Sequence, residues 1–129
     1  MIRTMLAATT LALLATTGPA AAVATGPGAK ARTKLTVSYT ADAGFASAVV
    51  LSCDPVAGAH PAGAQACAVL KKVDGRPAKL RPAPAMCTLE YAPITARITG
   101  TWKGSTVKWS KKFGNRCDLT RTTGALFSF

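Results

Sequence analysis

The side chains that most enzymes use for proton transfer are scarce in this sequence, which holds one histidine, His60, and one glutamate, Glu90. His60 precedes Pro61 and belongs to no motif with a carboxylate or a free cysteine, so we interpret it as a structural residue. The scattered aspartates show no spacing that would pair two catalytic carboxylates. The G-x-S-x-G, P-loop and dinucleotide-binding motifs are also missing. We therefore predict that the protein is not an enzyme.

Signals for metal binding, membrane insertion and nucleic-acid binding are missing too. The cysteines form no C-x-x-C pair and only one histidine accompanies them, which argues against a zinc site. The apolar run at residues 5–15 is shorter than the roughly 20 residues that span a bilayer, and no later segment is long enough. Lys and Arg residues are scattered, without interleaved aromatic residues. We predict no metal, no cofactor, no membrane span and no nucleic-acid partner.

The N-terminus carries the features of a secretory signal peptide. Arg3 provides a basic start, the apolar run follows, and Ala22-Val23-Ala24 is typical of a cleavage site. We predict a signal peptide at residues 1–24 and a secreted, extracellular mature protein. Residues 25–33 are rich in Gly, Pro and basic residues and are predicted to form a disordered arm. The remainder, residues 34–129, is long enough for one domain.

Alternation of apolar and polar residues predicts most of the secondary structure of that domain. The clearest strand is residues 94–102, and a turn after Trp102 leads into a returning strand that ends at Phe113. We further predict strands at residues 35–39, 48–53 and 126–129, a helix at 62–73, a turn at 54–58 and irregular chain at 76–83, and we assign no element to the polar residues 118–124. The fold class is therefore α+β, with about five antiparallel strands and one or two helices on one face.

All four cysteines lie in the predicted mature chain, at Cys53, Cys67, Cys87 and Cys117. An even number of cysteines in a small secreted protein predicts two disulfides. Three pairings are open on this ground alone. One of them, Cys53 with Cys67, would attach the predicted helix to the second strand.

The segment at residues 84–93, P-A-M-C-T-L-E-Y-A-P, has a proline at each end and a cysteine inside. Pro84 and Pro93 restrict their own φ and favour extended geometry in the residues before them. Cys87 offers a covalent anchor two residues before Leu89. Because proteases bind substrates as extended strands, a rigid extended segment that is hard to release would act as an inhibitor. We interpret Leu89 as exposed.

Several stretches together resemble the Streptomyces subtilisin inhibitor-like family of secreted serine-protease inhibitors. They are C-T-L-E-Y-A-P, G-N-R-C, C-D-P-V-A-G-A-H-P-A-G-A-Q-A-C, T-W-K-G and the terminal F-S-F. The resemblance implies a five-stranded antiparallel sheet with two short helices on one face, and a homodimer formed through the sheet. It also implies disulfides from Cys53 to Cys67 and from Cys87 to Cys117.

The same resemblance implies the residues of the inhibitory site. Leu89–Glu90 corresponds to the reactive bond of a substrate-like inhibitor. The residues that contact the protease around it would be Met86, Cys87, Thr88 and Tyr91, with Pro93 and Asn115 supporting the loop. Leu89 favours subtilisin-like and chymotrypsin-like proteases, because leucine cannot reach the acid at the base of a trypsin-like pocket.

Two other functions remain as alternatives. With a formal net charge of +11, the protein could be a basic secreted binding or antimicrobial protein that acts on anionic cell envelopes. A weaker alternative is a cross-linking partner in the extracellular matrix, through Gln65 and the lysines. Moderate salt distinguishes the first alternative, because charge-driven binding weakens as the Debye length falls below about 10 Å.

Overall fold

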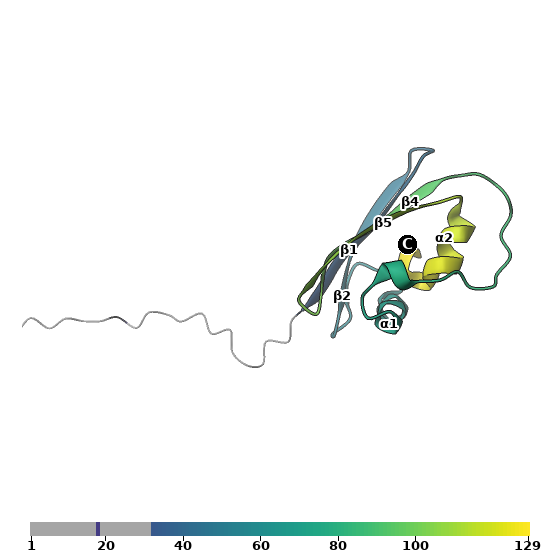
Figure 1. Ribbon diagram of the computed structural model, residues 1–129. Coiled ribbons are helices and arrows are strands. Elements are labelled where there is room, and N and C mark those ends of the chain that lie inside the picture. The colour runs from purple at the N-terminus through teal and green to yellow at the C-terminus, as the bar shows by residue number, and fades with distance from the viewer. Residues whose placement is uncertain (1–17, 19–31) are drawn as a thin grey trace, which may run out of the picture.

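The computed structural model describes Gly18 and residues 32–129, in which a five-stranded antiparallel sheet carries its helices on one face (Figure 1). The strands are β1 (Thr33–Ala41), β2 (Ala46–Cys53), β3 (Ala57–Gly58), β4 (Ile94–Trp102) and β5 (Ser105–Phe113), in the order β3-β2-β1-β4-β5. The predicted signal peptide, apart from Gly18, and the predicted arm up to residue 31 lie outside the described residues. β1 begins at Thr33, the last residue assigned to the arm.

The sheet follows the alternation seen in the sequence. Val37 lies at the centre of the sheet, opposite Val49 on β2 and Ile98 on β4, and its side chain is fully buried. The β4–β5 hairpin turns through Lys103 and Gly104, whose φ angles of 46° and 84° are both positive. This geometry gives a two-residue turn whose twist suits the flanking strands. The strands predicted over residues 35–39, 48–53 and 94–113 are confirmed.

The helical layer consists of α1 (Gly63–Lys72), α2 (Arg116–Thr123) and two short 3-10 turns, η1 (Pro77–Lys79) and η2 (Gly124–Phe127). Leu70 from α1, Leu119 from α2 and Leu126 from η2 are fully buried in one core with the inward side chains of the sheet. Burying each such side chain stabilises the fold by roughly 1.5–3 kcal/mol. The core therefore holds α2 firmly against the sheet.

One sequence prediction at the C-terminus is wrong, and one helix there is not predicted by the pattern of the residues. Residues 126–129, predicted as a strand, lie partly in η2, because Leu126 and Phe127 both insert into the core between α1, α2 and the sheet. Residues 118–124, to which the sequence analysis assigned no element, lie mostly in α2. The fifth strand is instead β3, two residues within the region predicted as a turn. α2 contains too few apolar residues to form an apolar stripe at helical spacing. The pattern of apolar and polar residues therefore did not predict this helix.

Both disulfides have the pairing implied by the family resemblance. Cys53 at the end of β2 is bonded to Cys67 in α1, with their Cα atoms 5.8 Å apart. Cys87 is bonded to Cys117 in the first turn of α2, with a Cα–Cα distance of 5.6 Å. The first disulfide joins α1 to the sheet. The second joins α2 to an otherwise irregular part of the chain.

His60 is buried, as expected for a structural residue. One ring nitrogen, Nε2, lies 2.9 Å from the carbonyl oxygen of Leu126, and Nδ1 accepts a hydrogen bond from the Ala62 N–H at 3.0 Å. Its ring packs edge-on against Phe129. His60 therefore links the entry of α1 to the C-terminus.

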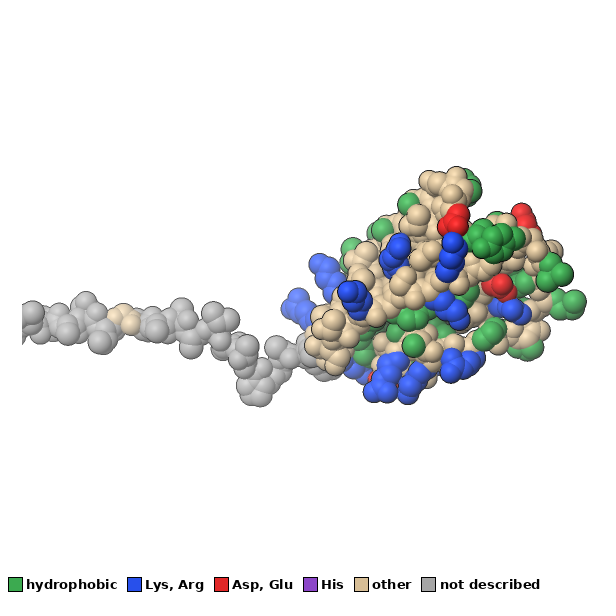
Figure 2. Space-filling model, turned by 45° about the horizontal axis from the view of Figure 1, so that its top comes forward, with side chains coloured by type: hydrophobic (Ala, Val, Ile, Leu, Met, Phe, Trp, Pro, Cys, Tyr) green, Lys and Arg blue, Asp and Glu red, His purple; other side chains and the backbone are tan. Residues whose placement is uncertain are grey.

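Charged side chains are unevenly distributed over the surface. Figure 2 shows Lys and Arg mainly over the left and lower parts of the molecule, while hydrophobic side chains gather at the right-hand end. The right-hand end is where Figure 1 places the long connection that leads into β4. Within residues 32–129 no helix is long and apolar enough to cross a bilayer.

Candidate functional site

The 84–93 segment runs without helix or strand on the helical side of the molecule before the chain enters β4 (Figure 1). Its large side chains project into solvent, since Leu89 is 101% exposed, Met86 98% and Tyr91 78%. A domain of this size normally buries residues of these types. Their exposure on one segment indicates that this surface is kept free for a partner.

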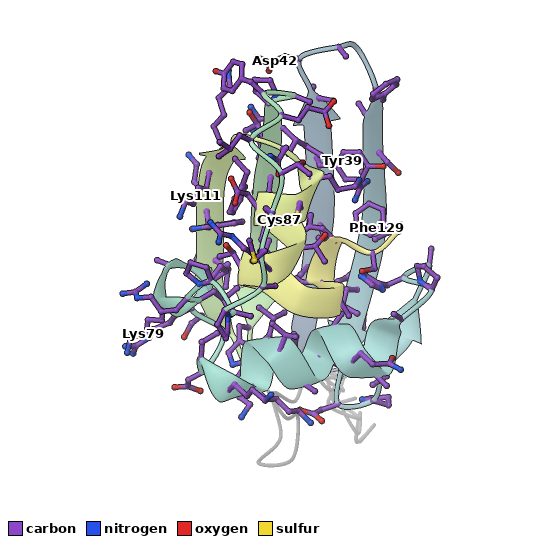
Figure 3. The ribbon with its side chains drawn as sticks, turned by 90° about the vertical axis from the view of Figure 1, so that its right-hand side faces the viewer. Tyr39, Asp42, Lys79, Cys87, Lys111 and Phe129 are labelled. Atoms are coloured by element: carbon purple, nitrogen blue, oxygen red, sulfur yellow. A yellow bond between two sulfur atoms is a disulfide. The ribbon has the colours of Figure 1, made fainter. Side chains whose placement is uncertain are left out.

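One covalent bond anchors the segment near its middle. The disulfide between Cys87 and Cys117 attaches it to the first turn of α2, as Figure 3 shows beside the label of Cys87. Leu89 lies only two residues beyond this anchor. On the other side of the bond, Cys117 is two residues before Leu119, which is buried in the core. The exposed side chains are therefore carried on a backbone whose position is set by the core.

Asn115 makes the contacts closest to the Leu89–Glu90 peptide bond. Its side chain is 7% exposed, and its Nδ2 donates to the carbonyl oxygens of Thr88 at 3.1 Å and Glu90 at 2.8 Å. Its Oδ1 accepts a hydrogen bond from the Asp118 N–H at 2.8 Å and so caps α2. One buried side chain thus connects the start of α2 with the backbone on both sides of the Leu89–Glu90 bond.

The N-terminal end of the segment is attached to the last turn of α2. The N–H of Ala83 donates to the Arg121 carbonyl oxygen at 2.7 Å, and Arg121 Nη1 lies 3.5 Å from the carbonyl oxygen of Ala85. The guanidinium is held in turn by Asp118, whose Oδ1 is 2.8 Å from Arg121 Nη2. Arg121 therefore holds the residues around the start of the segment, Ala83 through its backbone and Ala85 through its side chain.

The C-terminal end is attached to two other elements. The N–H of Ala92 donates to the Gly114 carbonyl oxygen at 2.8 Å, and the Asp42 N–H donates to that of Pro93 at 3.0 Å. Asp42 lies in the β1–β2 turn and pairs with Lys112 at 2.8 Å. This hydrogen bond and the charge of the carboxylate raise the pKa of Lys112 above its ordinary value. Both partners are half exposed, so the ion pair adds little to stability.

The structure thus brings together all eight residues that the resemblance placed at the site. It adds Asp42, Gly114, Asp118 and Arg121, which the sequence analysis missed. Two of these, Gly114 and Asp42, bind the segment through backbone atoms, and backbone contacts leave no signature in side-chain identity. Arg121 follows Asp118 by three residues, a spacing at which oppositely charged side chains pair on a helix. The pair could have been predicted only if α2 had been recognised as a helix first.

The contacts of the site converge on one peptide bond. Among the described residues, no three His, Cys, Asp or Glu side chains gather where they could hold a metal ion. The Leu89–Glu90 bond is displayed on a segment without helix or strand that is held on either side by side-chain and backbone hydrogen bonds and by a disulfide. An exposed bond that is held in this way is the arrangement expected of a proteinaceous protease inhibitor.

Comparison with known proteins identifies the family. Residues 29–115 match the subtilisin inhibitor-like family model, and the chain belongs to this family. It is 38% identical over 98 residues to subtilisin inhibitor-like protein 1 of Streptomyces cacaoi, covering 73% of this chain and 89% of that protein. The subtilisin inhibitor of Streptomyces violaceus is 39% identical over 127 residues, covering 92% of this chain and 87% of that protein.

The fold is similar to one that has been solved with a protease. The match is to a crystal structure of Streptomyces caespitosus sermetstatin in complex with Bacillus licheniformis subtilisin, with a TM-score of 0.59 and 25% identity. It covers 75% of this chain and 100% of the matched chain. The protein is therefore a protease inhibitor of the subtilisin inhibitor family, and its relatives are inhibitors rather than enzymes.

Proposed function

We propose that the protein is a secreted inhibitor of subtilisin-like and chymotrypsin-like serine proteases, with Leu89–Glu90 as its reactive bond. The observation that carries the proposal is the position of Asn115, which donates to the carbonyl oxygens of both Thr88 and Glu90. These contacts hold the backbone on the two sides of one peptide bond. The side chain of Leu89, fully exposed between them, is free to enter a protease pocket.

Binding follows from the shape of the segment. Leu89 fills the primary specificity pocket, while residues 86–88 pair with the protease as an added strand. Tyr91 contacts the enzyme on the other side of the bond. Because the segment is already ordered, little conformational entropy is lost on binding, and an interface of standard size can give high affinity.

Such a segment inhibits because the two chain ends formed by cleavage leave the protease slowly. After hydrolysis, the new carboxyl end at Leu89 stays attached through Cys87 and the new amino end at Glu90 stays attached through β4. Asn115 contacts the backbone of both sides. Pro93 restricts the chain where it enters β4. The two ends remain close enough for religation to compete with release.

Secretion and self-association complete the proposal. Two disulfides in a chain of this size favour an oxidising, extracellular compartment, in agreement with the predicted signal peptide. A homodimer would form through the sheet face opposite the helices. Short side chains such as Thr36 and Thr99, adjacent to each other on β1 and β4, would let two such faces approach closely.

Titration of the purified, oxidised protein against subtilisin, chymotrypsin and trypsin tests the proposal. We expect tight inhibition of the first two enzymes and weak inhibition of trypsin. Mass spectrometry of the mixtures should show slow cleavage at Leu89–Glu90 only. A folded protein that inhibits none of the three would contradict the proposal, and would favour the basic surface as the functional feature.

Replacing Asn115 should weaken inhibition through the loop. Asn115→Ala removes two hydrogen bonds to the segment, and a loss of about 1 kcal/mol for each raises Ki by about 30-fold. It also removes the cap of α2, which lowers the thermal unfolding temperature. Asn115→Asp separates the two effects, because aspartate keeps the cap but cannot donate to Thr88 or Glu90. An Asp variant with unchanged Ki and unchanged cleavage rate would show that the two donated hydrogen bonds are unimportant.

A further inference from the structure

The β1–β2 turn places a second large apolar side chain next to the 84–93 segment. Phe45 is 69% exposed, although phenylalanine is normally buried. It lines a hollow of about 570 Å³ together with Tyr91, Glu90 and Arg116. Thr88 and Ala92 of the segment line the same hollow. A protein that covers the Leu89–Glu90 bond would therefore also cover this opening.

Two residues that line the hollow, Tyr39 and Arg116, contact each other and the C-terminal residues. The Arg116 guanidinium lies 4.6 Å from the centre of the Tyr39 ring, and its Nη1 donates to the carbonyl oxygen of Phe127 at 3.2 Å. Tyr39 in turn donates through its hydroxyl to the carbonyl oxygen of Phe129 at 3.3 Å. Figure 3 shows Tyr39 and Phe129 side by side and faces this side of the molecule.

The backbone of Phe45 is connected by hydrogen bonds to the segment that carries the reactive bond. The N–H of Ala41 donates to the Phe45 carbonyl oxygen at 2.7 Å, and the N–H of Gly44 donates to the Ala41 carbonyl oxygen at 2.9 Å. These two hydrogen bonds join the two ends of the β1–β2 turn. The hydrogen bond from the Asp42 N–H to Pro93 attaches the turn to the end of the segment. The backbones that carry Phe45 and Tyr91 are therefore already connected before binding, which reduces the entropic cost of contact.

We propose that Phe45, Tyr91 and the hollow between them form a second contact surface for the protease. Its occupant is an apolar side chain from a surface loop of the protease, on the side of the reactive bond that begins with Glu90. Two observations favour this occupant: the hollow is continuous with the segment that carries Leu89, and apolar side chains gather at this end of the molecule (Figure 2). Phe45 thereby determines affinity in addition to Leu89.

The inference rests on the proposed inhibition and is tested by measuring Ki for subtilisin. Aromatic side chains at interface centres commonly cost more than 1 kcal/mol when truncated, so Phe45→Ala should raise Ki by about tenfold. We expect the dissociation rate to increase, with the unfolding temperature unchanged because Phe45 is exposed. Phe45→Leu should recover part of the affinity.

The matched control is Val56→Ala, since Val56 is an exposed apolar residue beyond the other end of β2. Its Ki should stay within about twofold of wild type. If wild type inhibits subtilisin while Phe45→Ala binds equally well, the second contact surface is wrong and the reactive bond stands. If wild type does not inhibit subtilisin, both proposals fail. An equal loss in the Phe45 and Val56 variants would also overturn the inference, because it would indicate a non-specific effect.

Discussion

Replacing Cys87 and Cys117 together by alanine is expected to turn the protein from an inhibitor of subtilisin into a substrate. The disulfide joins residues that are 30 positions apart, and in the chain-entropy model such a cross-link stabilises the folded state by roughly 3–4 kcal/mol, because it lowers the entropy of the unfolded chain. Where the same free energy keeps the 84–93 segment in its inhibitory conformation, losing it raises Ki by about two to three orders of magnitude. The cleaved end at Leu89 would also leave more readily, so hydrolysis should run to completion.

The other disulfide supplies the control for this experiment. Cys53→Ala with Cys67→Ala removes a cross-link between β2 and α1, away from the 84–93 segment. This variant should be less stable but should still inhibit at temperatures where it is folded. Ki and the amount of cleaved protein should be measured for both variants, with circular dichroism to confirm folding. Complete retention of inhibition by a folded Cys87/Cys117 variant would contradict the role that we assign to the cross-link.

Leu89→Lys is expected to redirect inhibition from chymotrypsin to trypsin. A lysine at position 89 can reach the acid at the base of the trypsin pocket, and a buried charge pair of this kind is worth about 2–5 kcal/mol at an interface. Trypsin inhibition should therefore strengthen by at least about 30-fold. Binding to chymotrypsin should weaken by a similar factor, because its apolar pocket would have to accept a charge.

Met86→Lys is the matched control for the specificity change. Met86 is as exposed as Leu89 and lies in the same segment, so this variant adds the same charge three residues earlier. It should leave the order of preference among the three proteases unchanged. A comparable gain in trypsin inhibition from Met86→Lys would show that charge, rather than entry into the pocket, sets specificity. Unchanged trypsin binding by Leu89→Lys would place the reactive bond elsewhere.

The helix that the residue pattern did not predict, α2, and the strand that it wrongly predicted at residues 126–129 have a common physical cause. In α2, most residues are polar, including Asp118, Thr120 and Arg121. The sequence therefore shows no apolar stripe at helical spacing, although Leu119 is fully buried. Its start is specified by Asn115, a cap whose meaning depends on the helix that follows. In η2, neighbouring Leu126 and Phe127 are both buried by tertiary packing, whereas a strand with one buried face would expose one of them.

By itself, the sequence determined the features that depend on neighbours in the chain. Period-two alternation determined β4 and β5, the spacing and number of cysteines indicated two cross-links, and the prolines around Leu89 indicated an extended segment. The family resemblance then indicated which bond is presented to the protease. The strands and the cross-links are confirmed, because both follow from local geometry and residue type, whereas the extended segment and the reactive bond stay predictions.

Only the tertiary structure decided how the segment is supported. The two hydrogen bonds from Asn115, the contacts with Gly114 and Arg121, and the position of Phe45 beside Tyr91 all join residues that are distant in sequence. Each requires α2 and the β1–β2 turn to be packed on the sheet before the partners meet. Contacts of this kind arise from the packing of the core, and many of them involve backbone atoms that every residue shares.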